Sequence, residues 1–231
     1  MLNRAEIKLA AKQSMKQQWG LAIGAPLLFF VISFAGGVIG WIPIIGWIIL
    51  WGTVFFVDFP LTVGLFDLFR KISKNERADI GDLFMAFKGN FMRKVGGMAW
   101  MYLWILLWSL VGIVSLFIPT IIKYLSYSMT PYILAEYPKV EATNALKLSM
   151  RMTNGYKGQL FVLGLSFIGW FILGAFTLGI LTIVFVIPYY YTTYAAYYEE
   201  LKRRALESGT IGAAELGVAE HEAAEPVTQL Q

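Results

Sequence analysis

Six long apolar stretches constrain the fold of this chain more than any other feature. They cover residues 21–39, 44–66, 95–117, 120–137, 160–176 and 180–198. Each is close in length to the roughly twenty apolar residues that an α-helix needs to cross a bilayer. Only 15% of the residues are charged and 58% are hydrophobic, which leaves too little polar surface to cover a soluble domain. The sequence therefore predicts an all-α, polytopic membrane protein with six transmembrane helices and excludes a soluble enzyme.

The positions of the cations predict the orientation of these spans. Of the 19 Lys and Arg residues, all but Lys123 lie before the first span, in the connections that follow the second and fourth spans, or after the sixth. Cytoplasmic segments of membrane proteins are enriched in Lys and Arg. We therefore expect both termini and both long connections in the cytoplasm, with the spans arranged as three hairpins.

A cytoplasmic segment that can form an amphipathic helix precedes each hairpin. In the first, Asn3 and Glu6 form a capping pair. In the second, Asp79 caps a helix with an apolar stripe of Ile80, Phe84, Phe87 and Phe91. In the third, one face consists of Ala142, Leu146, Ser149 and Met150. Such helices lie at the headgroup layer of the bilayer or pack beneath the helix bundle, and the sequence leaves both arrangements open.

Basic side chains on and beside these segments are the candidate lipid contacts. Cations close to the cytoplasmic leaflet are attracted to anionic headgroups. The candidates are Arg4, Lys8, Lys12, Lys16, Lys147, Arg151 and Lys157. We therefore expect the membrane partners to be anionic lipids on the cytoplasmic side.

Two regularities suggest a threefold repeat of a helix followed by a hairpin. Residues 12–16 (KQSMK) resemble residues 147–151 (KLSMR). The second helix of each predicted hairpin contains a proline, at Pro60, Pro131 and Pro188. Repeats that all start and end in the cytoplasm share one orientation, unlike the inverted repeats of many transporters. The alternative is that prolines are simply tolerated in membrane helices.

Asp58 is the only acidic residue deep within a predicted span. An ionisable group at that depth is a candidate functional site by default. The fourth span is the most polar and supplies the other members of a candidate intramembrane site. These members are Tyr124, Ser126, Ser128 and Thr130. The alternative is that Asp58 is protonated or structurally paired beside the backbone groups that Pro60 frees.

The sequence lacks the residues on which common catalytic and metal sites depend. It has no cysteine, and its single histidine, His221, lies outside the six spans, so thiolate chemistry and most metal sites are excluded from the membrane part. Nucleotide-binding motifs are also missing. We therefore expect a protein that is not an enzyme, holds no cofactor and does not bind nucleic acid.

The last residues differ in composition from the rest of the chain. From Ser208 onward they contain glutamates but no Lys or Arg, and they have no aromatic residue. We expect a membrane domain over residues 1–206 and an acidic, mobile cytoplasmic tail over residues 207–231. This tail and the cytoplasmic helices are candidate contacts for a protein partner.

Several stretches of the second half resemble one known family. They include residues 126–138 (SYSMTPYILAEYP), 154–161 (NGYKGQLF), 165–170 (LSFIGW) and 196–201 (AYYEEL). The chain resembles a bacterial integral-membrane family, domain of unknown function 975 (DUF975), over about residues 1–202. The resemblance implies a six-span protein of the bacterial cell membrane, distantly similar to the membrane domain of some glycerophosphodiester phosphodiesterases. It implies no activity and no catalytic residue.

Two functions follow from these observations. The first is a non-enzymatic membrane protein that engages lipid headgroups or a protein partner in a scaffold, regulatory or envelope-stress role. The second is a transporter, or a subunit of one, that uses Asp58 and the polar face of the fourth span.

Overall fold

The computed structural model describes residues 3–39 and 45–217, and every regular element among them is helical. The α-helices are α1 (Arg4–Gln17), α2 (Trp19–Ile39), α3 (Ile45–Thr53), α4 (Phe59–Ser73), α5 (Phe91–Val114), α6 (Ile118–Tyr127), α7 (Thr130–Glu136), α8 (Ala142–Met152), α9 (Lys157–Phe176) and α10 (Ile187–Glu207). Two π-helical segments, η1 (Val54–Asp58) and η3 (Thr182–Val186), lead into α4 and α10. Two 3₁₀ segments, η2 (Ile80–Phe87) and η4 (Ala213–Leu216), complete the set.

Among the described residues, four helices are long and apolar enough to cross a membrane. They cover Trp19–Val38, Ile45–Ser73, Phe91–Ile113 and Lys157–Phe176, which correspond to the first, second, third and fifth predicted spans. Large apolar side chains on their outer faces are exposed, among them Phe34, Ile48 and Leu110. Contiguous exposed apolar surface of this kind requires a nonaqueous environment. The architecture is therefore that of an all-helical membrane protein.

The fourth predicted span is divided into two shorter helices. The helix breaks between α6 and α7, just before Pro131, because proline lacks an N–H group and restricts the residue that precedes it. Ser149 of α8 bridges the break: its hydroxyl accepts from the Met129 N–H at 3.2 Å and donates to the Ser126 carbonyl at 2.7 Å. The buried face of α8 thus satisfies backbone groups that the interrupted helix leaves open.

The sixth predicted span coincides with η3 and the first half of α10. Its second half is rich in tyrosine and threonine and is largely buried against other helices. Pro188 follows η3 as Pro60 follows η1. A π-helical turn accommodates a proline because the ladder of i→i−4 bonds is already interrupted there. Two of the three prolines in the predicted repeat therefore share one local structure.

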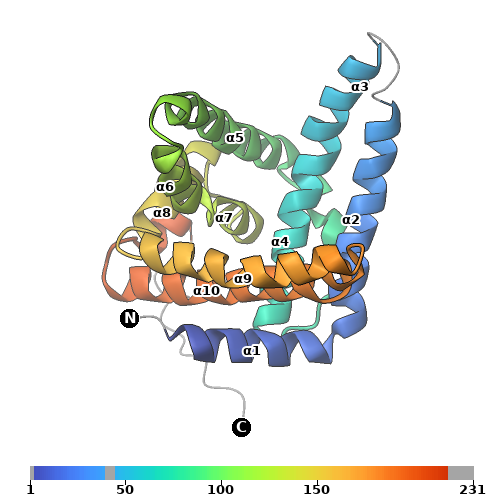
Figure 1. Cartoon of the computed structure of the whole chain (residues 1–231). Helices are drawn as coiled ribbons and strands as arrows, with labels where there is room; N and C mark the ends of the chain where they lie inside the picture. Colours follow the sequence, from blue (N-terminus) through green and yellow to red (C-terminus); the bar gives the residue numbers. More distant parts are fainter. Residues whose placement is uncertain (1–2, 40–44, 218–231) are drawn as a thin grey trace.

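The core lies where α4, α7 and α10 meet, and other elements pack around it (Figure 1). Among the largest fully buried side chains are Phe69 of α4, Tyr132 of α7, and Tyr197 and Tyr198 of α10. Helix α1 runs along α10, and α9 packs on α10 through ring contacts of Phe167 with two tyrosines. The segment η2 packs so closely on α4 that an added Cβ at Gly64 would overlap the Leu83 carbonyl oxygen.

The three expected amphipathic segments form, with one change in helix type. The Asn3 side chain accepts from the Glu6 N–H at 3.4 Å at the start of α1. Asp79 caps η2 reciprocally with Asp82, but this segment is a 3₁₀ helix instead of the expected α-helix. A 3₁₀ helix has three residues per turn, so Leu83 and Ala86 are buried and the predicted stripe is displaced toward the surface.

The apolar faces of these segments differ in what covers them. In α1 and α8 they are buried on the protein, through Ala11 and Met15 in α1 and Leu146 in α8. In η2, Phe84 and Phe87 are exposed, and their rings continue as a row to Phe91. Packing beneath the bundle therefore describes α1 and α8, whereas η2 presents an apolar row outward.

The fold continues beyond the predicted domain boundary at residue 206. That boundary falls inside the last turn of α10, and Ile211 and Leu216 are buried. Glu215 pairs with Arg151 of α8 at 2.7 Å. The first part of the acidic segment is thus docked on α8, and residues 218–231 lie outside the described residues.

Candidate functional site

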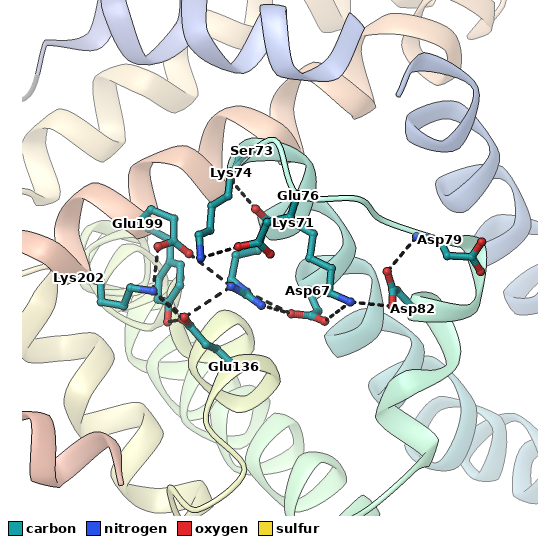
Figure 2. A network of polar contacts seen from close by, with 12 residues as sticks. Asp67, Lys71, Ser73, Lys74, Glu76, Asp79, Asp82, Glu136, Glu199 and Lys202 are labelled. Carbon is teal, nitrogen blue, oxygen red and sulfur yellow. Dashed lines mark hydrogen bonds and ion pairs between the residues drawn. The ribbon is translucent and has the colours of Figure 1, made fainter. Parts of the chain in front are cut away.

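A network of charged side chains joins the C-terminal ends of α4 and α7 to α10. The last turn of α4 supplies Arg70, whose guanidinium lies 2.9 Å from Asp67 of the same helix. The same group lies 3.5 Å from Glu136 of α7 and 3.8 Å from Glu199 of α10. Lys202 completes the circuit, at 2.7 Å from Glu136 and 2.8 Å from Glu199. Figure 2 shows the two glutamates and Lys202 turned toward one another.

The Glu136 carboxylate is the centre of this network. It receives the Tyr198 hydroxyl at 2.6 Å in addition to Lys202 and Arg70. The exposed fractions of the Arg70, Lys202 and Glu136 side chains are 11%, 12% and 15%. Buried charges of this kind persist only when they are paired and hydrogen-bonded. The three helices are therefore held together by groups that depend on one another.

A second branch of the network reaches η2. Lys71 lies 2.7 Å from Asp82 and 3.8 Å from Asp67 (Figure 2). The other carboxylate oxygen of Asp82 accepts from the Asp79 N–H at 2.9 Å. The capping box of η2 is thereby connected to the charges of α4. Each carboxylate in both branches has a cation beside it, so the arrangement suits a structural clamp better than a catalytic base.

Part of this network has a signal in the sequence. Asp67 and Arg70, and Glu199 and Lys202, are spaced i, i+3 at the predicted ends of spans, which is the spacing of helical ion pairs. The positive-inside rule uses the two cations of these pairs for orientation and does not use the carboxylates. The pairing with Glu136 joins positions 66 residues apart, and no local pattern indicates it.

The predicted intramembrane site is only partly assembled. The Asp58 carboxylate accepts from the Ser33 hydroxyl of α2 at 2.7 Å, and its carbonyl accepts from Thr62. Tyr124 and Ser128 line a common cavity of about 280 Å³, which Asp58 does not line. The remaining two are buried elsewhere: Ser126 donates to the Ile122 carbonyl, and the Thr130 hydroxyl has no hydrogen-bond partner among the described residues. Asp58 thus pairs with the first predicted span, and of the four predicted residues of the fourth span only Tyr124 and Ser128 share a cavity.

The candidate lipid contacts fall into two groups. Lys8 and Arg151 have partners within the protein. Lys8 donates to Ser166 at 2.8 Å and lies over the Phe167 ring, and burial followed by repulsion from Arg4 lowers its pKa. Lys157 is half-buried. The other members, Arg4, Lys12, Lys16 and Lys147, are exposed, and so is Arg151.

The family is decided by a match that covers most of the chain. The model of a family described as proteins of unknown function matches residues 1–125 and 113–205. The chain belongs to the DUF975 family. Every member of the charged network in this DUF975 protein lies within the matched residues, whereas the docked segment that contains Glu215 lies beyond them. No curated protein and no solved structure matches the chain.

Proposed function

We propose that this DUF975 protein is a non-enzymatic, six-span protein of the bacterial cell membrane that binds anionic lipid headgroups through its cytoplasmic face. In this proposal both termini are cytoplasmic, and the charged network keeps the cytoplasmic face rigid. The protein acts as a scaffold or regulator that presents this face to a protein partner.

The arrangement of α1 is the observation that carries the proposal. Its inner face is buried on the fold through Ala11, Ser14 and Met15, so the helix is held in place. Arg4, Lys12 and Lys16 of the same helix are exposed. A cation near an anionic leaflet contributes about 1 kcal/mol to membrane attraction. Three exposed cations on a helix that is held in place therefore provide a surface for acidic headgroups.

The exposed aromatic row of η2 supports the same orientation. Phe84, Phe87 and Phe91 lie in the connection between the second and third predicted spans, and Lys88 follows Phe87 directly in that connection. Apolar rings beside cations are typical of segments that lie at the membrane interface. The row and the cations of α1 are both consistent with a lipid-contacting cytoplasmic rim.

The proposal is tested by lipid retention in nanodiscs. The full chain is reconstituted in equimolar phosphatidylglycerol and phosphatidylcholine, and the lipids that stay bound are counted by native mass spectrometry. We expect phosphatidylglycerol to be enriched. The triple variant Arg4→Gln, Lys12→Gln, Lys16→Gln should reduce this enrichment at least about fivefold.

The matched control changes exposed but uncharged residues of the same helix. Gln13→Ala with Gln17→Ala should leave the enrichment as it is in the unchanged protein. Equal enrichment in the triple variant and in this control would contradict the proposal.

A transporter is the second candidate, and one observation favours it. Hydroxyls of the fourth predicted span line a cavity together with Thr62, which is one helical turn from Asp58. A transporter of this kind would show proton- or ion-dependent flux in proteoliposomes that Asp58→Asn abolishes. Flux that is unaffected by Asp58→Asn would exclude a role for this carboxylate.

A further inference from the structure

A cavity of about 280 Å³ lies among α2, α4, α5, α6, α7 and α10. Its volume is near the lower end of the range for small-molecule sites. Among the described residues none that lines it is charged. Hydroxyl groups are abundant instead, because seven tyrosines, Thr62 and Ser128 contribute to the wall. The cavity thus combines aromatic and apolar surface with many uncharged hydrogen-bonding groups.

Among the residues that line the cavity, Tyr132 gives the strongest indication that a ligand binds there. Its side chain is fully buried, and its hydroxyl has no hydrogen-bond partner among the described residues. The ring is held at 4.6 Å from Phe66 and 4.9 Å from Tyr198, measured between ring centroids. A buried hydroxyl without a partner is unfavourable. Because neighbouring rings hold Tyr132, it cannot readily turn to find another partner.

The neighbouring hydroxyls that have partners show how unusual Tyr132 is. Thr62 donates to the Asp58 carbonyl at 2.7 Å, and Ser128 donates to the Leu125 carbonyl at 2.8 Å. Tyr198, which stacks on Tyr132, donates to Glu136. The hydrogen bond to Glu136 therefore holds the Tyr198 ring in place, and the Tyr198 ring stacks on Tyr132.

The cavity opens toward the apolar surface of the protein. Tyr102 of α5 and Tyr124 of α6 line it and have exposed fractions of 46% and 54%. On the outer faces of the same two helices, Leu106 and Ile121 are exposed. Met98 and Tyr132, by contrast, are fully buried at its inner side. A molecule dissolved in the bilayer can therefore reach the tyrosines between α5 and α6.

We propose that this cavity binds an uncharged polar group that carries hydroxyl and carbonyl oxygens, such as the headgroup of a diacylglycerol. Hydroxyls both donate and accept hydrogen bonds, so they match a group of this kind. A charged headgroup would lose its hydration without finding an opposite charge in the wall. The same chemistry occurs in a neutral lipid and in a free polyol such as glycerol. The inference is independent of the lipid contacts proposed for α1.

The test uses a photoreactive diacylglycerol in phosphatidylcholine nanodiscs that contain the full chain. We expect crosslinks to residues that line the cavity, and competition by dioleoylglycerol. If glycerol competes as well as dioleoylglycerol, the ligand is a free polyol, and the proposal that the cavity binds an uncharged polar group still holds. Equal competition by phosphatidylglycerol or by a quaternary ammonium compound would overturn the proposal, as would crosslinks confined to the outer surface.

Two conservative variants separate binding from folding. Tyr132→Phe removes only the hydroxyl, and we expect about a tenfold loss of diacylglycerol affinity, since a net hydrogen bond contributes about that factor. Its thermal stability should not fall, because the hydroxyl has no partner among the residues that the structure describes. Tyr197→Phe is the control: that hydroxyl is also buried and without a hydrogen-bond partner among the described residues, but Tyr197 does not line the cavity. Unchanged affinity in Tyr132→Phe, or an equal loss in Tyr197→Phe, would overturn the proposal.

Discussion

At the scale of single residues, one carboxylate connects three helices. Glu136 ends the short helix α7 and lies against Arg70 of α4 and both Tyr198 and Lys202 of α10. Removing one member of a buried ion pair leaves the others with uncompensated charge. Substitution of Glu136 should therefore lower the free energy of unfolding by more than any single one of its contacts contributes.

We expect Glu136→Gln to destabilise the fold strongly. The amide keeps the shape of the side chain but leaves Arg70 and Lys202 without that negative charge, which should lower the free energy of unfolding by about 3–5 kcal/mol. Thermal unfolding in detergent measures this change. Glu207→Gln is the control, because its pair with Arg203 has a carboxylate that is 59% exposed, and it should cost less than about 1 kcal/mol. Equal effects of the two substitutions would contradict the role given to Glu136.

At the scale of elements, the closeness of η2 to α4 depends on the missing side chain of Gly64. The Leu83 carbonyl occupies the place where a Cβ would lie. This contact positions Asp82 beside Lys71 at 2.7 Å. The absence of a side chain at Gly64 therefore permits both the packing of η2 on α4 and the ion pair between Asp82 and Lys71.

We expect Gly64→Ala to displace η2 from α4. Backbone atoms cannot move aside as the end of a side chain can, so the free energy of unfolding should fall by about 1–3 kcal/mol. Gly96→Ala on α5 is the matched control, since nothing lies within 4 Å of its added Cβ and alanine favours a helix over glycine. Thermal unfolding of both variants distinguishes the effects. A Gly64→Ala protein as stable as the Gly96→Ala protein would argue against the close packing.

Docking of the segment after α10 on α8 should depend on pH. Hydrogen bonds from Arg151 and from the Gly212 N–H hold the pKa of Glu215 below its ordinary value. A lowered pKa means that the ionised form favours docking above the ordinary glutamate pKa of about 4.3, and that this contribution disappears as the pH falls through the lower folded value. Because the pair is exposed, the effect is small.

Hydrogen exchange over residues 208–217, corrected for intrinsic rates, measures this dependence. Protection should fall by at most about fivefold at acidic pH. Glu215→Gln should reproduce the low-pH protection at neutral pH and remove the dependence. A pH profile that is unchanged in Glu215→Gln would contradict the assignment.

The sequence predicts the features that depend on neighbouring residues and does not predict those that depend on contacts between distant segments. Four spans could be predicted because length and hydropathy are local properties, and the caps by Asn3 and Asp79 are local as well. The hydrogen bonds that Ser149 makes across the break before Pro131, and the close packing of η2 on Gly64, come from other elements, so no local pattern predicts them. For the same reason, the i, i+3 ion pairs of α4 and α10 have a signal in the sequence. The pairing of Glu136 with both helices and the cavity that Tyr132 lines have none.

At the scale of the whole molecule, the account depends on which side of the membrane each basic segment occupies. Four helices meet the requirements for crossing by length and composition. The six-span arrangement adds α6 with α7, and η3 with the first half of α10. It places nearly all Lys and Arg residues on one side, as the positive-inside rule requires. An arrangement with four spans alone would put the connection that contains Lys147 outside.

Single cysteines test this arrangement directly, because the chain contains none of its own. Lys147→Cys, Leu178→Cys and Lys12→Cys are placed at exposed positions, and position 12 reports the side on which α1 lies. An impermeant maleimide is applied to intact spheroplasts and to inverted vesicles. The account predicts that position 178 is labelled only in spheroplasts, and that positions 12 and 147 are labelled only in inverted vesicles. Labelling of position 147 from outside and of position 178 from inside would contradict it.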